Sequence, residues 1–129
     1  MANFTLVLTQ SPTLSISHLQ AIDFIEAAVL AGHTIKSVFF YQDAVYAALN
    51  TQMPIQGQVA VALQWQTLAQ KYGFNLDVCI ANALRRGVVD STEQTRYSLP
   101  ATTLAAGFNL KGLGELATAC KECDRVIQF

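Results

Sequence analysis

The 129-residue sequence predicts a single α/β domain, spanning residues 1–129, with a three-layer α/β/α sandwich around a mainly parallel sheet of about five strands. Two observations lead to this fold class. Short apolar runs alternate with longer segments whose apolar residues recur at helical spacing. The apolar runs are continuous, which is typical of strands that are covered on both faces. Such an alternation of strands and helices favours parallel pairing.

The first expected strand is the apolar run Phe4–Leu8, which ends before the polar residues around Pro12. The other expected strands are Ile35–Phe40, Asn75–Val78, Phe108–Leu110 and Arg125–Gln128. Helical segments lie between consecutive strands, so we expect all of the strands to run in the same direction.

The first helix is expected to begin near Ser17 and to end at Gly32. Ser17 and Gln20 have the spacing of a capping box, and glycine commonly ends a helix. After the second strand, Asp43 is expected to cap a short helix that continues to Leu49.

A polar, proline-containing loop is expected over Asn50–Gly57, before a longer helix from Gln58 to Gly73. Its apolar stripe has helical spacing and consists of Val61, Trp65, Leu68 and Tyr72. This stripe is expected to face the core or an interface.

Three further helical segments are expected in the last part of the chain. The first runs from about Ile80 to Gly87. A surface segment over Asp90–Pro100 is expected to contain a helical turn that starts with a solvated Asp90 and Glu93. The last helix spans Leu113–Ala119.

Composition limits the classes of function. Hydrophobic residues make up 52% of the chain and charged residues 13%, against roughly 25% charged in a typical soluble domain. A small domain cannot easily bury that much apolar surface alone, so we expect an oligomer. The net charge of -1 argues against direct nucleic-acid binding. The sequence shows neither a secretory signal nor an apolar run long enough to cross a membrane, which predicts a cytoplasmic protein with reduced thiols.

Cys79 is the candidate catalytic residue. It follows the strand Asn75–Val78 and directly precedes the helix expected at Ile80. The positive end of a helix dipole favours the thiolate, which is the reactive form of cysteine, and the role requires an accessible sulfur. The alternative is that Cys79 is a small buried hydrophobic residue.

Ligands of parallel α/β sheets bind beyond the carboxyl ends of the strands. The residues expected there are Ser11, Tyr41, Cys79 and the segment Gly112–Gly114. Cys79 is therefore expected at the functional edge of the sheet, with Tyr41 as a neighbouring binding residue.

Arg85 and Arg86 are the other candidate binding residues. Arg86 is seven residues from Cys79, close to two helical turns, so both are expected on one face of the helix. Their axial separation is about 10 Å, so Arg86 is expected to guide a partner rather than contact the sulfur. The alternative is that both arginines favour the carboxyl end of the helix. A Cys–His hydrolase is poorly supported, because His33 precedes a strand and His18 begins a helix.

Cys120 and Cys123 form a C-x-x-C motif. A zinc site needs a second Cys or His pair, and a redox site of this type follows a strand. Cys120 and Cys123 instead end a helix that leads into the last strand, so they are expected to be partly buried structural thiols. No metal or cofactor is expected.

The segment Cys79–Asp90, CIANALRRGVVD, resembles the active-site segment of TusD-type subunits in the DsrE-like sulfurtransferase family. The resemblance continues through Ser37–Tyr41, Val45–Tyr46, Gly107–Phe108, Gly112–Gly114 and Cys123–Phe129. The segments Ser11–Ser15 and Gln42–Ala44 differ from the pattern of these subunits, so the rim of the site is expected to differ as well.

The resemblance implies a DsrE-like fold and a cytoplasmic sulfur relay. Cys79 would accept a persulfide sulfur from a TusA-like donor and pass it to a TusE-like acceptor. The sulfur would end as 2-thiouridine at the wobble position of tRNA. The resemblance also implies a heterohexamer with TusB- and TusC-like subunits.

Three alternatives remain open from the sequence. The chain could be a DsrE-type subunit of a sulfur-oxidation pathway, with the same chemistry at Cys79. It could be a non-catalytic scaffold subunit of a hetero-oligomer. A nucleotide-binding domain is the weakest alternative, because no glycine-rich loop follows the first strand.

Overall fold

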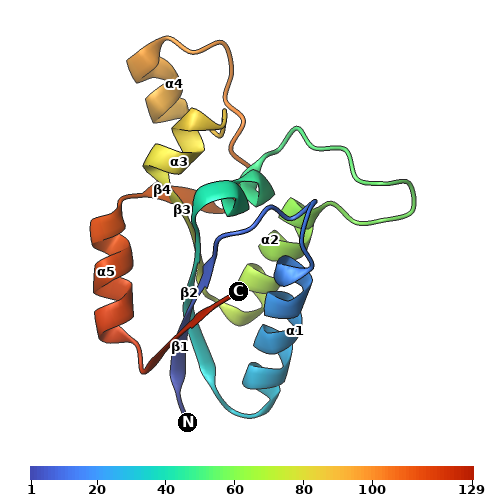
Figure 1. Cartoon of the computed structure of the whole chain (residues 1–129), viewed down its shortest axis with the longest axis vertical. Helices are drawn as coiled ribbons and strands as arrows, with labels where there is room; N and C mark the ends of the chain where they lie inside the picture. The colour runs from blue at the N-terminus through green and yellow to red at the C-terminus, as the bar shows by residue number, and fades with distance from the viewer.

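A five-stranded parallel sheet lies at the centre of the molecule, with strand order β4-β3-β2-β1-β5 (Figure 1). The computed structural model describes all residues from 1 to 129. The strands are β1 (Asn3–Leu8), β2 (Thr34–Phe40), β3 (Asn75–Cys79), β4 (Phe108–Lys111) and β5 (Arg125–Gln128).

The helices form two outer layers and an extension at one end of the sheet (Figure 1). They are α1 (Ser17–Leu30), the 3-10 helix η1 (Gln42–Ala48), α2 (Val61–Tyr72), α3 (Ile80–Arg85), α4 (Ser91–Tyr97) and α5 (Leu113–Glu122). In Figure 1, α1 and α2 lie on one side of the sheet, α5 lies on the other, and α3 and α4 project beyond its end. The predicted α/β/α fold with a parallel sheet is confirmed. No helix has the length and apolar character needed to cross a membrane.

The main hydrophobic core lies between the sheet and the layer formed by α1 and α2. Trp65, from the predicted stripe of α2, is fully buried there and packs edge-on against Phe40 with ring centroids 5.2 Å apart. Leu68 is also buried in this core. Burial of large aromatic and aliphatic side chains is the main force that fixes this layer on the sheet.

The opposite face of the sheet has a thinner cover. Helix α5 has no residue that is fully buried. Buried Thr5 of β1 nevertheless donates its hydroxyl hydrogen to the carbonyl of Ala119 in α5, at 3.4 Å. Lys36 of β2 pairs with Glu122 at the end of α5. These contacts place α5 over the second face.

The start of α1 differs from the expected capping box. Its N-cap is Ile16, and Ser17 is already the first helical residue. The hydroxyl of Ser15 accepts a hydrogen bond from the Ser17 N–H at 3.1 Å. The Ser17 hydroxyl is therefore buried without a partner, and the predicted pairing of Ser17 with Gln20 is wrong.

Two other helix starts also differ from expectation. Tyr41, not Asp43, is the N-cap of η1, and no side chain caps this helix. Helix α2 begins at Val61, so the preceding loop extends beyond Gln58 to Ala60. The Asp43 side chain pairs with Arg86, and Gln58 remains in the loop before α2, so neither side chain caps a helix.

Helix α4 begins as expected at Asp90, whose carboxylate accepts a hydrogen bond from the Glu93 N–H at 2.8 Å. The Glu93 side chain itself was expected in solvent, but the residue is only 4% exposed. One of its oxygens lies 3.3 Å from the Arg96 guanidinium, and the other is buried without a partner. The prediction of a solvated Glu93 is therefore wrong, because α4 turns this side chain inward.

Candidate functional site

Cys79 lies where the sequence predicted it, at the carboxyl end of β3 and directly before α3. It is the last residue of the strand and the N-cap residue of the helix. Strands β2 and β4 flank β3 on its two sides. Cys79 is only 2% exposed in the single chain. The expectation of an accessible sulfur is therefore wrong for the chain by itself, because a strand flanked on both sides holds the thiol within the sheet edge.

The two faces of β3 face different helix layers of the molecule. Leu76 and Val78 belong to the core beneath α1 and α2. Because side chains alternate along a strand, Asp77 and Cys79 point toward the layer of α5. Phe39 of β2 pairs with Asp77, is 2% exposed and lies outside the main core. The Cys79 thiol thus belongs to the second, thinner layer of the molecule.

Tyr41 occupies the corresponding place at the end of β2. Phe40 pairs with Val78, so Tyr41 and Cys79 each follow one member of this pair. Tyr41 has an extended backbone and is partly buried. The predicted neighbourhood of Tyr41 and Cys79 at one edge of the sheet is consistent with this register.

Arg86 joins α3 to η1. Its Nε donates to the Asp43 carboxylate at 2.8 Å, and one of its terminal nitrogens donates to the Asn82 carbonyl at 3.2 Å. The Asn82 side chain accepts a hydrogen bond from the Gln42 N–H at 2.7 Å. These bonds explain why Asp43 does not cap η1. They also give Arg86 a structural role between two elements, and its role in guiding a partner stays a prediction.

Arg85 differs from Arg86. It is exposed and takes part in no ion pair. It lines a shallow recess of about 350 Å³ together with Leu84, Tyr97 and Leu99. Of the two arginines, Arg85 is therefore the one that presents a free positive charge at the surface of the α3–α4 extension.

Asp77 is a carboxyl group on this face whose pKa is shifted from its usual value. Burial raises the pKa of Asp77, Lys111 of β4 opposes that rise, and Glu115 of α5 adds to it. Asp77 accepts no hydrogen bond and forms no ion pair within contact distance. A carboxyl that is desolvated without a partner is costly to ionise.

His18 does not assist Cys79. Trp65 donates its indole N–H to Nδ1 of His18 at 3.2 Å, and Nε2 lies 2.8 Å from the Gln10 carbonyl. Since Nδ1 accepts, Nε2 carries the proton and donates it to that carbonyl. Burial lowers the pKa of His18, and the backbone bond to Gln10 opposes this shift. His33 lies at the other end of the sheet, where it accepts the Ala2 N–H at 2.9 Å. A Cys–His arrangement is therefore absent.

The C-x-x-C motif lies at the opposite end of α5 from the carboxyl edge of the sheet. Cys120 and Cys123 are partly buried free thiols, as predicted. Burial, together with the neighbouring Cys123, raises the pKa of Cys120. The Cys123 thiol lies 3.2 Å from the Arg125 carbonyl, as a donor to it. No group of three His, Cys, Asp or Glu side chains converges in an arrangement that could hold a metal ion.

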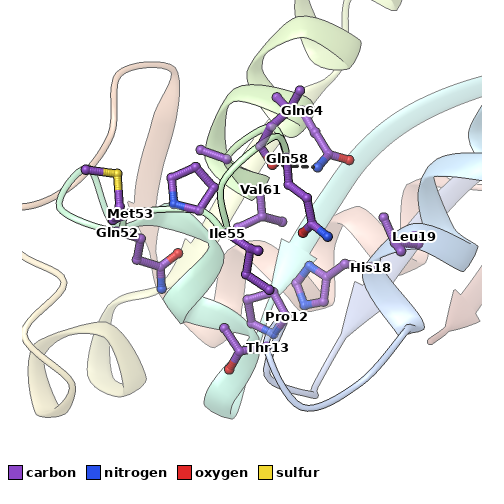
Figure 2. A pocket seen from close by; sticks show the side chains of 13 residues that line it. Pro12, Thr13, His18, Leu19, Gln52, Met53, Ile55, Gln58, Val61 and Gln64 are labelled. Atoms are coloured by element: carbon purple, nitrogen blue, oxygen red, sulfur yellow. Dashed lines mark hydrogen bonds between the residues drawn. The ribbon is translucent and has the colours of Figure 1, made fainter.

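A second recess, of about 410 Å³, lies between the loop after β1, the start of α1 and the loop before α2 (Figure 2). Figure 2 shows Pro12 and Thr13 on one side, with Met53 and Ile55 from the long loop across from them. His18 forms part of its wall. Cys79 does not line this recess, so the recess is separate from the predicted catalytic residue.

Sequence reasoning missed three features, two of them next to Cys79 and the third the separate recess of Figure 2. Lys111 lies beside Cys79 in the sheet, since these two residues pair across β3 and β4. Asp77 lies on the same face as Cys79, and the recess of Figure 2 collects residues from separate loops. The alternation along β3 could have placed Asp77, but the positions of Lys111 and of the recess depend on strand pairing and loop packing.

The fold and the cysteine at the carboxyl edge of a parallel sheet define a class of small α/β proteins. Within this class, residues 2–129 match the model of the DsrE/DsrF-like family, so the chain belongs to this family. The family is linked to sulfur transfer. The structure is similar to the crystal structure of the YchN protein from E. coli, with a TM-score of 0.73, 22% identity and 100% of each chain covered. At this identity, the similarity shows a shared fold.

Proposed function

We propose that this chain is a sulfurtransferase subunit of a cytoplasmic sulfur relay. Cys79 accepts a persulfide sulfur and passes it to an acceptor protein, and the sulfur ends as 2-thiouridine at the tRNA wobble position. The observation that carries the proposal is the place of Cys79 at the carboxyl end of β3 and the start of α3, in a chain of the DsrE/DsrF-like family.

The proposed step is a thiol exchange. The Cys79 thiolate attacks the outer sulfur of a donor persulfide, R–S–SH, and a new S–S bond forms on Cys79. The S–S bond of the donor breaks, and its electron pair leaves with the donor as R–S⁻. The products are Cys79–S–SH and a donor thiolate, so charge and oxidation state balance without an oxidant, metal or cofactor.

Access to Cys79 is the main requirement of this proposal. Because the residue is 2% exposed, the edge of the sheet must open before a donor can reach the sulfur. The nearby η1–α3 connection is joined by two side-chain contacts, the hydrogen bond from Gln42 to Asn82 and the Asp43–Arg86 pair. Gln42 has a positive φ of 52°, which is uncommon for a residue other than glycine. Docking of a partner at this connection would provide the opening.

The surface around the Figure 2 recess supports assembly with other subunits. No Asp, Glu, Lys or Arg occurs from Ala44 to Gln70. We call the four exposed large apolar side chains that line the recess the apolar patch: Leu19 (53% exposed), Met53 (92%), Ile55 (72%) and Val59 (56%). Depletion of charge and exposure of large apolar side chains are typical of the core of an interface. In the proposed assembly, TusB- and TusC-like subunits complete a heterohexamer, with a TusA-like donor and a TusE-like acceptor.

The net charge of -1 supports a carrier that leaves tRNA to another protein. In this proposal neither the chain nor its exposed Arg85 holds nucleic acid directly. Arg85 and Tyr41 instead contact the protein partners at the edge of the sheet. Sulfur delivery to a sulfur-oxidation pathway would use the same residues, and a thiolated-tRNA assay with a deletion of this chain separates the two.

The test is sulfur loading of Cys79. The full chain, with its co-purifying partners, is incubated with a persulfide donor, and the intact mass is measured. The wild type is expected to gain ~32 Da, the mass of one sulfur atom, whereas Cys79→Ser is expected to gain nothing. The matched control is the Cys120→Ser, Cys123→Ser double variant, which should load like the wild type. A wild type that never loads, or a Cys79→Ser variant that still does, contradicts the proposal.

The burial of Cys79 favours a second candidate, a non-catalytic scaffold subunit. In that case Cys79 fills space at the sheet edge, and the apolar patch carries the function of the chain. Alkylation within the assembled complex discriminates between the two. A scaffold cysteine reacts slowly in the single chain and in the complex, whereas a sulfur carrier reacts faster once its partners are bound.

A further inference from the structure

Lys111 is the cross-strand neighbour of Cys79. The register of β3 and β4 pairs Asp77 with Asn109, Val78 with Leu110 and Cys79 with Lys111. Paired residues of neighbouring parallel strands project from the same face of the sheet, and adjacent strands are about 4.8 Å apart. Leu110 packs against the main core, so Lys111 and Cys79 both project toward the layer of α5.

The Lys111 ammonium has no fixed partner. Lys111 is partly buried, yet it takes part in none of the ion pairs of the chain. Lys36, on the same face, pairs with Glu122, and Lys71 pairs with Glu26 at 3.6 Å. Among the lysines of the sheet, Lys111 is therefore the one whose charge remains available for another group.

Lys111 also acts on Asp77, the acid that shares this face of β3 with Cys79. Lys111 lowers the pKa of Asp77, against the larger effect of burial, so its ammonium lies within electrostatic reach of this strand. The charged and titratable groups around the carboxyl end of β3 are Asp77 and Lys111 in the sheet, Glu115 on α5, Tyr41 at the end of β2, and the mutually paired Asp43 and Arg86. Since Arg86 is already paired, Lys111 is the free cation of this group.

We propose that Lys111 is a positioning residue for the proposed sulfur transfer, and that its ammonium holds the Cys79 sulfur as an anion. The inference rests on the proposed function. Before the transfer, the positive charge favours the attacking thiolate of Cys79. After it, Cys79–S–SH releases its proton to solvent, and the same charge stabilises the persulfide anion. A unit charge on the neighbouring strand acts across a partly buried site, where screening is weaker than in water.

The simplest alternative is that Lys111 only compensates the charge of Asp77. The two roles differ in a double-mutant comparison. If Lys111 acts on Cys79, removal of its charge affects the sulfur equally in the wild type and in an Asp77→Asn background. If Lys111 acts only on Asp77, the effect on the sulfur disappears in that background.

The experiment measures the alkylation rate of Cys79 by iodoacetamide from about pH 6 to 9, with each cysteine followed in its own peptide. The full chain is used, and the midpoint of the pH profile is read because burial slows the reaction at every pH. Lys111→Met is expected to move the midpoint up by roughly 0.5 to 1 pH unit, which lowers the rate at neutral pH by roughly 3- to 10-fold. Lys111→Arg should restore the profile. Lys121→Met, an exposed lysine in the last turn of α5, is the matched control and should leave it unchanged.

An unchanged midpoint in a folded Lys111→Met protein overturns the inference, as does an effect that vanishes with Asp77→Asn. Lys111→Gln gives the same comparison if the methionine variant does not fold. The sulfur-loading measurement keeps this result separate from the proposed function. A shifted midpoint without any sulfur uptake rejects the relay alone, and uptake with an unshifted midpoint rejects the role of Lys111 alone.

Discussion

The buried imidazole of His18 is held neutral by its surroundings. Its two nitrogens are occupied by Trp65 and by the Gln10 carbonyl, and burial lowers its pKa below the usual 6.5. The unfolded chain takes up a proton at His18 as the pH falls through about 6.5, whereas the folded chain does so only at lower pH. Stability from this group is therefore complete above that pH and is lost as the pH falls toward the folded pKa. His18 is thus a structural histidine, and we expect it to make the fold sensitive to acid.

The substitution His18→Gln tests this linkage. Between about pH 7.5 and 5.5 the free energy of unfolding of the wild type is expected to fall by up to about 1 kcal/mol more than that of the variant. Urea unfolding at the two pH values measures the difference. His33→Gln, at the other end of the sheet, is the matched control and should keep the acid-dependent loss. Equal pH slopes for the wild type and His18→Gln would show that His18 is not the group responsible.

At the scale of the elements, the η1–α3 connection lies against β3, the strand that ends at Cys79. Two short helices from distant parts of the sequence meet there through the Gln42–Asn82 and Asp43–Arg86 contacts. The backbone of Gln42 is held in the left-handed region, which costs of order 1 kcal/mol for a residue other than glycine. A connection that combines few bonds with a strained residue is expected to open more easily than the core strands.

Asn82→Ala is the sharpest test of this connection. The substitution removes the side-chain acceptor of the Gln42 N–H, and because this bond is exposed and water can replace it, the free energy of unfolding is expected to fall by roughly 0.5 to 1.5 kcal/mol. Hydrogen exchange at residues 41–44 and alkylation of Cys79 should both become faster. Asn50→Ala, an exposed asparagine in a loop, is the matched control with little expected change. Faster exchange without faster alkylation would mean that this connection does not cover Cys79.

At the scale of the whole molecule, the charged residues are unevenly distributed over the surface. The segment from Ala44 to Gln70 has no charged residue and carries part of the apolar patch, whereas the face of α5 carries lysines and acids. An apolar surface of this kind is stable in water mainly when another chain covers it. The high hydrophobic content noted in the sequence is therefore partly on the surface, and the oligomer stays a prediction.

The prediction for assembly uses a charge placed in the apolar patch. Ile55→Asp is expected to release the chain from its complex, because burying an unpaired carboxylate in an interface is strongly unfavourable. Purification of the tagged chain from its native host, followed by size-exclusion chromatography, measures the loss of co-eluting subunits. Leu30→Asp replaces another exposed apolar residue, 85% exposed at the end of α1, and should leave the complex intact. Loss of the complex in both variants, or in neither, would place the interface elsewhere.

The sequence by itself determined the order of strands and helices, the parallel sheet and the place of Cys79 at the end of β3. These features depend on local patterns: continuous apolar runs, helical spacing and glycines at helix ends. The tertiary structure decided the burial of Cys79, the pairing of Arg86 with Asp43 and the position of Lys111 opposite Cys79 in the sheet. These features depend on which strands become neighbours and how loops pack, and residues such as Cys79 and Lys111, far apart in the sequence, meet only through the pairing of β3 with β4.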